Sequence, residues 1–303
     1  MVHDELPFGA GPVSSSTDPA LRRIRLRDGR ILAYAEYGDP YGLPVVYCHG
    51  GLGSRLEIAF AADTCRRSGV RLLAIDRPGI GASDPQPGRT LVGWPYDVAH
   101  LADRLGITRC AVLGWSAGGP YALACASRLG RRVARVAIVG GLAPLELPAT
   151  VAELGMRAER LLLRLAIENP GRARILLRMA GYLPPRLLRA VLLYDLTSPS
   201  DRAVVTGLPA ESALDGFYEA IRCGVDGAVD DYRVLASSWE LGLGDITTEV
   251  NLWHGQEDNL VPVSHAERLS AHLPNARLIV LPGRGHFLLH VELEHVLSTL
   301  RYR

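Results

Sequence analysis

The sequence predicts an α/β fold, a mostly parallel, doubly wound sheet into which an all-helical segment is inserted. Short apolar runs, each ending at a glycine or in a Gly/Pro-rich loop, alternate with segments of helical periodicity. Strands that are apolar on both faces are typical of a parallel sheet covered by helices on both sides. Between about residues 142 and 239 this alternation stops, and Leu-rich amphipathic stretches replace it. An insertion between two halves of one sheet explains this pattern better than two independent domains.

The elements before the insertion follow in a regular order. Residues 21–40 alternate apolar and polar side chains around Asp28-Gly29, which predicts an antiparallel hairpin. The apolar runs and helical spacings that follow predict a strand at 43–50, a helix at 55–68, a strand from 70, a helix at 94–106, a strand at 110–116, a helix at 117–129 and a strand at 133–141.

The alternation resumes after the insertion. We expect a strand from residue 250, a helix at 264–272, a strand from 276 and a final helix near 287–301. The predicted division of the chain is therefore a flexible N-terminal tail at 1–20, a core formed by 21–141 and 240–303, and a helical cap at 142–239. Within the cap, leucines such as those at 161–163, 176–177 and 192–193 can pack on the core and line a pocket.

Composition excludes several classes of function. The chain has 303 residues, of which 48% are hydrophobic, enough for a sizeable core. The formal net charge of +1 gives no general attraction to nucleic acid or to anionic membranes. Every basic side chain among Lys and Arg is an arginine, which excludes lysine nucleophiles and Schiff bases.

Cysteine usage and the N-terminus bear on location. The five cysteines include no CxxC pair and no metal-like cluster with histidine, and an odd number of scattered thiols suits a reducing compartment. The first residues lack the charged start and apolar stretch of a signal peptide, and no apolar run approaches the roughly 20 residues of a membrane span. We expect a cytoplasmic protein without a metal ion, and the sequence leaves its oligomeric state open.

The segment CAVLGWSAGGP at residues 110–120 contains the first candidate for chemistry. It places Ser116 between Gly114 and Gly118 at the junction of a predicted strand and helix. A nucleophile on such a sharp turn is exposed above the sheet edge, and small residues on either side relieve the crowding. The pattern alone is a weak signal, because a tight strand–helix crossing with an incidental serine also explains it. A serine hydroxyl also needs a base and an acid to become reactive.

The ends of two later strands supply candidates for the acid and the base. Asp258 follows the strand that begins at 250, and His286 lies in a Gly-rich loop after the next strand. The order serine, aspartate, histidine is that of an α/β catalytic triad, and all three lie after strands, at one edge of a parallel sheet. Glu257 is an alternative acid. The weaker alternatives for the base are His254, His265 and His290.

The segment YCHGGLGSR at 47–55 is a Gly-rich loop that can turn backbone N–H groups toward a reacting carbonyl. We assign one oxyanion donor to the N–H of Gly51, with Leu52 as the alternative, and the second to the N–H of Ala117. His49 is interpreted as an organiser of the loop. The other interpretation, a phosphate-binding loop, lacks both the GK[ST] ending and the GxGxxG spacing.

Taken together, the motifs HGGxG, DRPGIGASD, GWSAGG, HGQEDNLVP and GRGH resemble those of the α/β-hydrolase superfamily. The resemblance covers the chain from about residue 25 and implies a helical cap after the sixth strand. It implies that Asp76 and Arg77 shape the loop beside the site. Serine at the nucleophile position argues against the epoxide hydrolase and haloalkane dehalogenase branches. The HGGLG loop is similar to that of proline iminopeptidases.

The expected function is that of a serine hydrolase that cleaves a small or medium apolar carboxylic ester through an acyl-enzyme on Ser116, without a cofactor. Candidate pocket residues are Leu52, Trp115, Tyr121 and Trp239, each equally explained by packing. Three alternatives would use the same triad, namely an aminopeptidase or amidase, a C–C bond hydrolase and a perhydrolase. A non-catalytic member of the fold that binds a small ligand is the alternative from another class.

Overall fold

A computed structural model describes residues 21–145 and 148–302. Eight strands form one sheet in the order β1-β2-β4-β3-β5-β6-β7-β8. Their bounds are β1 Leu21–Arg25, β2 Ile31–Gly38, β3 Leu43–Cys48, β4 Val70–Ile75, β5 Cys110–Trp115, β6 Val133–Val139, β7 Val250–Gly255 and β8 Ala276–Leu281. β2 pairs antiparallel with β1 and with β4, and the pairings from β4 through β8 are parallel. The predicted hairpin and the mostly parallel sheet are both confirmed.

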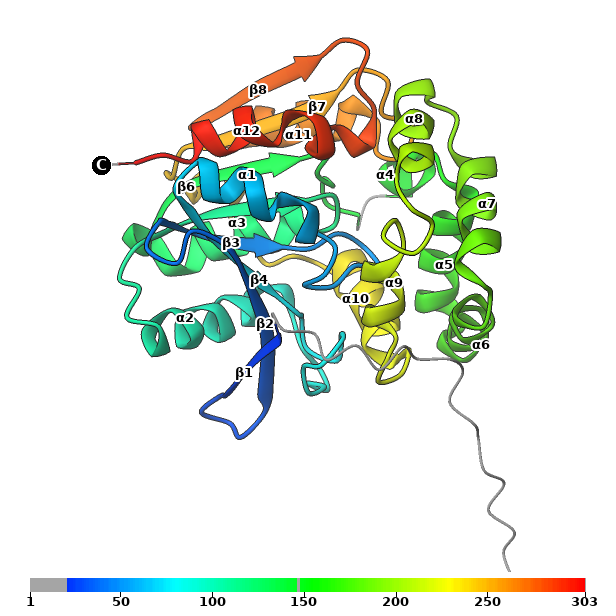
Figure 1. Ribbon diagram of the computed structural model, residues 1–303, viewed down its shortest axis with the longest axis horizontal. Helices are drawn as coiled ribbons and strands as arrows, with labels where there is room; N and C mark the ends of the chain where they lie inside the picture. The colour runs from blue at the N-terminus through cyan, green and yellow to red at the C-terminus, as the bar shows by residue number, and fades with distance from the viewer. Residues whose placement is uncertain (1–20, 146–147, 303) are drawn as a thin grey trace, which may run out of the picture.

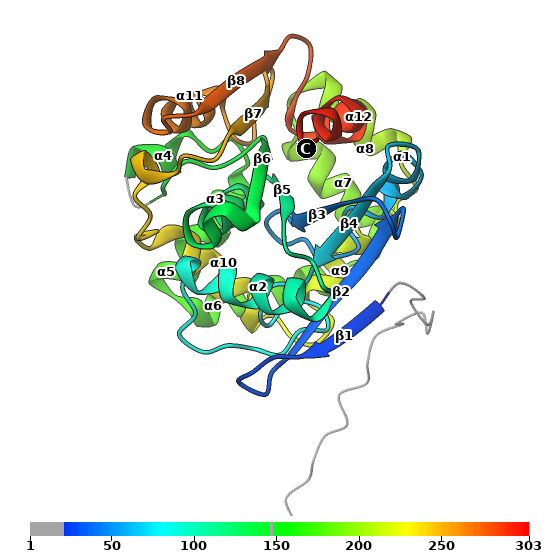
Figure 2. The ribbon, with the colours of Figure 1, turned by 90° about the vertical axis from the view of Figure 1, so that its left-hand side faces the viewer.

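Helices cover both faces of this sheet (Figure 2). One face carries α1 (Ala62–Arg67) and α12 (Leu289–Thr299), and the other carries α2 (Trp94–Arg104), α3 (Gly118–Leu129) and α11 (Val263–His272). Side chains alternate along β3, so that Val45 belongs to the first apolar layer and Val46 to the second. This two-sided burial explains why the strands read as continuous apolar runs.

The segment between β6 and β7 contains helices joined by loops, and no strand among its described residues. It contains α4 (Pro148–Glu153), α5 (Arg157–Glu168), α6 (Pro170–Gly181), α7 (Pro185–Asp195), α8 (Pro199–Gly207), α9 (Asp215–Ala220) and α10 (Asp226–Ala236). Four of these helices begin at proline, which is tolerated in the first turn because its missing N–H would have no partner there. Figure 1 shows this cap beyond the carboxyl ends of the parallel strands.

The helix predicted at 55–68 is shorter than expected. A 3-10 turn at Ala59–Ala61 leads into α1, and residues 54–58 belong to a loop. The N–H and guanidinium of Arg55 bond to Asp76, and the carboxylate of Glu57 bonds to the N–H of Gly50. These contacts hold the segment against the strand ends and prevent a helical start there.

Two groups of buried ion pairs tie the cap to the core. Asp231 on α10 lies 2.6 Å from Arg77 and 2.9 Å from Arg89, and Glu219 on α9 lies 2.6 Å from Arg55. Burial makes such pairs sensitive to the loss of either partner. The position of the cap over the strand ends is therefore fixed by charge as well as by apolar packing.

Three expectations from the sequence stay predictions. The predicted tail at 1–20 lies outside the described residues, and the cap boundaries at 142 and 239 stay a prediction. None of the helices in the described part of the chain has the length and apolar character that a membrane crossing needs. The cytoplasmic location also stays a prediction.

Candidate active site

Ser116 occupies a strained turn between β5 and α3. Its φ is +53°, in the left-handed region that non-glycine residues seldom adopt. Its N–H donates to the carbonyl of Val139 at 2.8 Å. A Cβ added to Gly118 would lie 2.0 Å from the carbonyl oxygen of Cys48, and one on Gly114 would lie 2.6 Å from the oxygen of Gly118. The glycines around the serine are therefore required by close backbone approach.

His286 and Asp258 form a buried hydrogen-bonded pair. His286 Nδ1 lies 2.8 Å from Asp258 Oδ2, and the other carboxylate oxygen accepts the N–H groups of Leu260 at 3.0 Å and Val261 at 2.9 Å. These backbone bonds fix the direction of the carboxylate. Since Nδ1 is occupied by the aspartate, Nε2 remains for a reacting group. His286 lines the same cavity as Ser116.

Charge around His286 favours its protonated form. Burial alone would lower its pKa, but the charge and hydrogen bond of Asp258, together with the charges of Asp201 and Glu159, outweigh burial and raise the pKa above the ordinary 6.5. An imidazole of raised pKa is a stronger proton acceptor once it is neutral. The arrangement suits a histidine that must take a proton from a hydroxyl.

The alternative acid and the alternative bases do not take part in the Asp258–His286 pair. Glu257 is exposed, and the structure gives it no bond to His286. His254 Nε2 lies 2.7 Å from the carbonyl oxygen of Val261, and His265 Nδ1 accepts the N–H of Ala143. His290 lines the cavity, but it stacks on Phe60, and burial lowers its pKa to about 4. Among the described residues, Asp258 is the only one hydrogen-bonded to the imidazole ring of His286.

The loop at residues 49–53, here called the oxyanion loop, lies beside the serine. A Cβ on Gly51 would lie 3.6 Å from the Cβ of Ala117, so the two predicted donors are neighbours. Within the described residues, no hydrogen bond uses the N–H of either one. Leu52 has a φ of +53°, so the loop is as strained as the serine turn.

Arg77 and Glu57 fix the orientation of the oxyanion loop. The guanidinium of Arg77 donates to the carbonyls of His49 at 2.5 Å and Gly50 at 2.8 Å, and Glu57 accepts the N–H of Gly50 at 2.7 Å. His49 Nε2 in turn accepts the N–H of Arg77 at 3.3 Å. Burial lowers the pKa of His49 well below its usual range. These contacts support a role for His49 in organising the loop.

The cavity between the core and the cap has a volume of about 840 Å³. Its walls are mainly apolar, and of the predicted pocket residues Leu52 and Trp115 line it. Cap helices contribute further leucines, among them Leu162, Leu176, Leu177, Leu188 and Leu192. A concave, mostly apolar space with a few polar groups is typical of a site for a small organic molecule.

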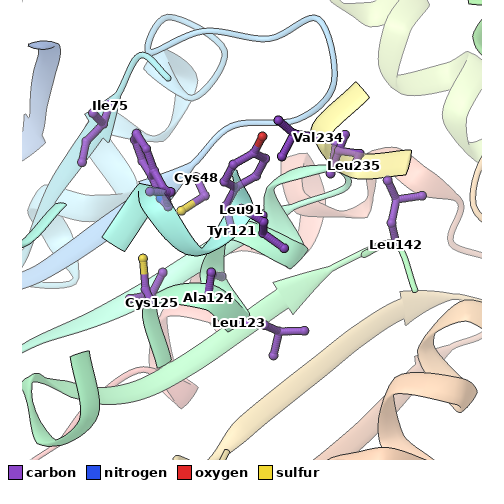
Figure 3. Packing of buried hydrophobic residues seen from close by; sticks show 14 of the residues in the cluster. Cys48, Ile75, Leu91, Tyr121, Leu123, Ala124, Cys125, Leu142, Val234 and Leu235 are labelled. Atoms are coloured by element: carbon purple, nitrogen blue, oxygen red, sulfur yellow. The ribbon is translucent and has the colours of Figure 1, made fainter. Parts of the chain in front are cut away.

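The assignment of Tyr121 and Trp239 to the pocket was wrong, because neither lines this cavity. Tyr121 on α3 is buried, and its hydroxyl donates to Asp231 at 2.7 Å. It packs among core side chains near Val234 and Leu235 of α10 (Figure 3). Trp239 is buried after α10, where its indole N–H donates to the carbonyl of Leu235. Both aromatic rings are core residues whose polar atoms are satisfied inside the protein.

Three carboxylates lie near the site although no sequence motif predicts a role for them there. Glu57 bonds to the oxyanion loop, Glu159 on α5 lines the cavity, and Asp201 on α8 accepts the N–H of His286 at 2.9 Å. Each lies in a segment whose pattern predicts only an amphipathic or loop structure. In the described ranges, no group of three or more His, Cys, Asp or Glu could hold a metal ion.

The sequence matches known hydrolases over most of its length. Residues 44–293 match the model of the family described as alpha/beta hydrolase fold. The chain is similar to the 2-hydroxy-6-oxo-6-phenylhexa-2,4-dienoate hydrolase of Comamonas testosteroni, with 30% identity over 270 residues and 85% of each chain covered. It is also similar to the pimeloyl-[acyl-carrier protein] methyl ester esterase of Aromatoleum aromaticum, with 31% identity over 82% of this chain and 93% of the relative.

Solved structures share the architecture. A thermophilic esterase from Thermogutta terrifontis superimposes with a TM-score of 0.66 at 22% identity, covering 92% of this chain and 95% of the esterase. At this identity the likeness establishes the fold. The fold likeness, the strand order and the match over residues 44–293 all point to the same family. The protein belongs to the alpha/beta hydrolase fold family, with a helical cap inserted between β6 and β7.

Proposed function

We propose that this protein is a serine hydrolase that cleaves small or medium apolar carboxylic esters. One observation supports this most directly: Ser116 and His286, which is hydrogen-bonded to Asp258, line a single, mainly apolar cavity. The relative from Aromatoleum aromaticum, named as an esterase, adds support.

In the acylation step, His286 Nε2 takes the proton of the Ser116 hydroxyl as Oγ attacks the ester carbonyl carbon. The resulting oxyanion is placed to receive hydrogen bonds from the N–H groups of Gly51 and Ala117. Asp258 holds the imidazole in the correct tautomer and stabilises its positive charge. Collapse of the intermediate breaks the bond to the alcohol oxygen, which takes the proton from His286.

In the deacylation step, neutral His286 takes a proton from water as the water oxygen attacks the acyl carbon. The same two N–H groups receive the second oxyanion. Collapse then breaks the bond to Ser116 Oγ, which regains its proton from His286, and the carboxylic acid leaves.

A C–C bond hydrolase is the second candidate. The relative from Comamonas testosteroni is named as a hydrolase of a dienoate, and its identity to this chain equals that of the esterase within one percentage point. The same serine, histidine and aspartate would serve that reaction. The two candidates therefore differ in the substrate that the cavity accepts.

Replacing the proposed nucleophile tests the proposal. In Ser116→Ala, kcat for p-nitrophenyl esters should fall by about 10³-fold or more, because the acyl-enzyme cannot form. Labelling by a fluorophosphonate probe should disappear with it. Ser237→Ala is the matched control, since this hydroxyl donates to a backbone carbonyl outside the cavity.

Other results would contradict the ester assignment. Faster cleavage of the phenylhexadienoate than of any ester in a chain-length series would favour the C–C hydrolase. Tight binding of an ester without turnover or probe labelling would instead indicate a non-catalytic member of the fold.

A further inference from the structure

The cavity carries negative charge without a matching positive group. Four carboxylates line it, from Glu57, Glu159, Asp195 and Asp215, and no arginine is among its lining residues in the described part of the chain. The chain contains no lysine at all. Its histidines in the wall are His286 and His290. A substrate that enters this space therefore approaches acidic side chains rather than basic ones.

Glu159 is the carboxylate that lies beside Gly51, the proposed oxyanion donor. Its Oε1 accepts the hydroxyl of Tyr232 at 2.8 Å, and a Cβ on Gly51 would lie 3.2 Å from the same oxygen and 3.3 Å from the tyrosine hydroxyl. Tyr232 is buried on α10, next to Asp231 in its ion pairs with the core. The carboxylate is thus held directly over the oxyanion loop by a rigid neighbour.

Glu57 differs from Glu159 in how its oxygens are used. Glu57 accepts both the N–H of Gly50 and the hydroxyl of Tyr47, so it acts on the loop itself. Glu159 has one side-chain partner, and no other hydrogen bond to it is present among the described residues. Both carboxylates line the cavity, but only Glu57 is hydrogen-bonded to the oxyanion loop, through its Oε2. Glu159 does not hold the loop, so its carboxylate is available to act on a substrate.

We propose that Glu159 selects against acyl groups that carry a negative charge, so that the substrate is an ester with an uncharged acyl chain. This rests on the proposed ester hydrolysis. In a space with apolar walls, the repulsion between two carboxylates is weakly screened and acts over the width of the pocket. An uncharged chain of the same length meets no such repulsion and gains from burial against the leucines.

The same charge separates this protein from one of its relatives. The substrate named for the Comamonas testosteroni enzyme is a dienoate and therefore a carboxylate. The described cavity wall contains no arginine that could pair with that anion, and the carboxylate of Glu159 would repel it. The inference thus favours the ester reaction over the C–C reaction on electrostatic grounds.

A matched pair of esters tests the inference. Mono-p-nitrophenyl adipate carries a free carboxylate, whereas its methyl-capped form, p-nitrophenyl methyl adipate, has the same chain without the charge. With nitrophenolate release measured at about pH 8, where an accessible carboxyl group is ionised, kcat/KM should favour the neutral ester by about tenfold or more. In Glu159→Gln, which keeps an oxygen for Tyr232, this ratio should fall at least about threefold.

The control is Asp226→Asn, because Asp226 is a cap carboxylate that pairs with Arg174 outside the cavity. Its ratio should equal that of the wild type. A wild-type ratio near one overturns the inference without any variant, and so does a ratio that Glu159→Gln leaves unchanged. Failure to cleave even the neutral ester, with no fluorophosphonate labelling of Ser116, would instead overturn the proposed function and the inference with it.

Discussion

At the residue scale, the spacing of His286 and Asp258 depends on a glycine from another strand end. Gly140 follows β6 with a φ of +55°. A Cβ there would lie 3.0 Å from His286 Nδ1 and 3.2 Å from Asp258 Oδ2, on either side of their hydrogen bond. The missing side chain allows the backbone to pass against the pair.

Gly140→Ala should lower kcat for ester hydrolysis by about tenfold or more, because the added methyl group presses on both partners of the hydrogen bond. The measurement is steady-state kinetics on a p-nitrophenyl ester. Gly69→Ala is the matched control: its φ is +61°, and nothing lies within 4 Å of its added Cβ. Both variants carry similar backbone strain of about 1 kcal/mol. Equal loss of activity in both would contradict the explanation.

At the element scale, helix α8 of the cap holds the loop that carries His286. Asp201 accepts the N–H groups of His286 at 2.9 Å and Phe287 at 2.8 Å. A Cβ on Gly285 would lie 2.3 Å from Asp201 Oδ2, so the glycine is needed for this contact. Asp201 is buried, and burial raises its pKa against the opposing effect of the two N–H groups. One carboxylate thus connects the cap to the proposed base.

Asp201→Asn should shift the acidic limb of the pH–rate profile. The proposed base must be neutral, and its raised pKa means that the wild-type rate falls as pH drops through a value above 6.5. Removing the Asp201 charge lowers the pKa of His286, so the variant should lose activity at a lower pH. The other charged or titratable groups that act on His286 are Asp258, Glu159, Glu57 and His254.

The measurement is kcat/KM across the imidazole range, with thermal unfolding recorded beside it. Asp226→Asn is the control, because it removes a cap carboxylate that does not contact the His286 loop. A lower rate with an unmoved acidic limb would show that Asp201 acts only on stability.

At the scale of the whole molecule, Asp231 is the main electrostatic link between cap and core. It lies within ion-pair distance of Arg77 and Arg89 and accepts the hydroxyl of Tyr121. Although burial opposes it, the nearby arginine charges hold the pKa of Asp231 far below its usual range. Removing the carboxylate would leave two buried guanidinium groups without their partner.

Asp231→Ala should lower the free energy of unfolding by about 3–5 kcal/mol, the cost of uncompensated buried charge. Denaturant unfolding followed by circular dichroism measures this. The adjacent Asp230→Ala is the control, because Asp230 is only partly buried and lies 3.6 Å from Arg233 in a surface pair worth less than about 1 kcal/mol. Similar losses in both variants would contradict the role given to Asp231.

Much of the architecture could be predicted because it depends on local pattern. Apolar runs marked the strands, and the glycines around Ser116 marked a turn that only small neighbours permit. The ends of parallel strands share one edge, so Asp258 and His286 could be placed together from chain order alone.

The remainder depends on contacts that no local pattern encodes. Tyr121 and Trp239 are as apolar as Trp115, and only packing decides which ring faces the cavity. Glu159 and Asp201 are single acidic residues on amphipathic cap helices, where a carboxylate usually faces water. Their roles follow from how the cap lies on the core, which is a long-range property.

The bond from Asp201 to the His286 loop bears on how such enzymes can be re-engineered. Grafting the helices of another enzyme onto this sheet would exchange the walls of the cavity but would also remove the acceptor for two backbone N–H groups. A chimera of this kind needs a carboxylate at the equivalent place of its new helix. Without such a carboxylate, the chimera would have the cavity of the other enzyme, but the loop that carries His286 would no longer be held in place.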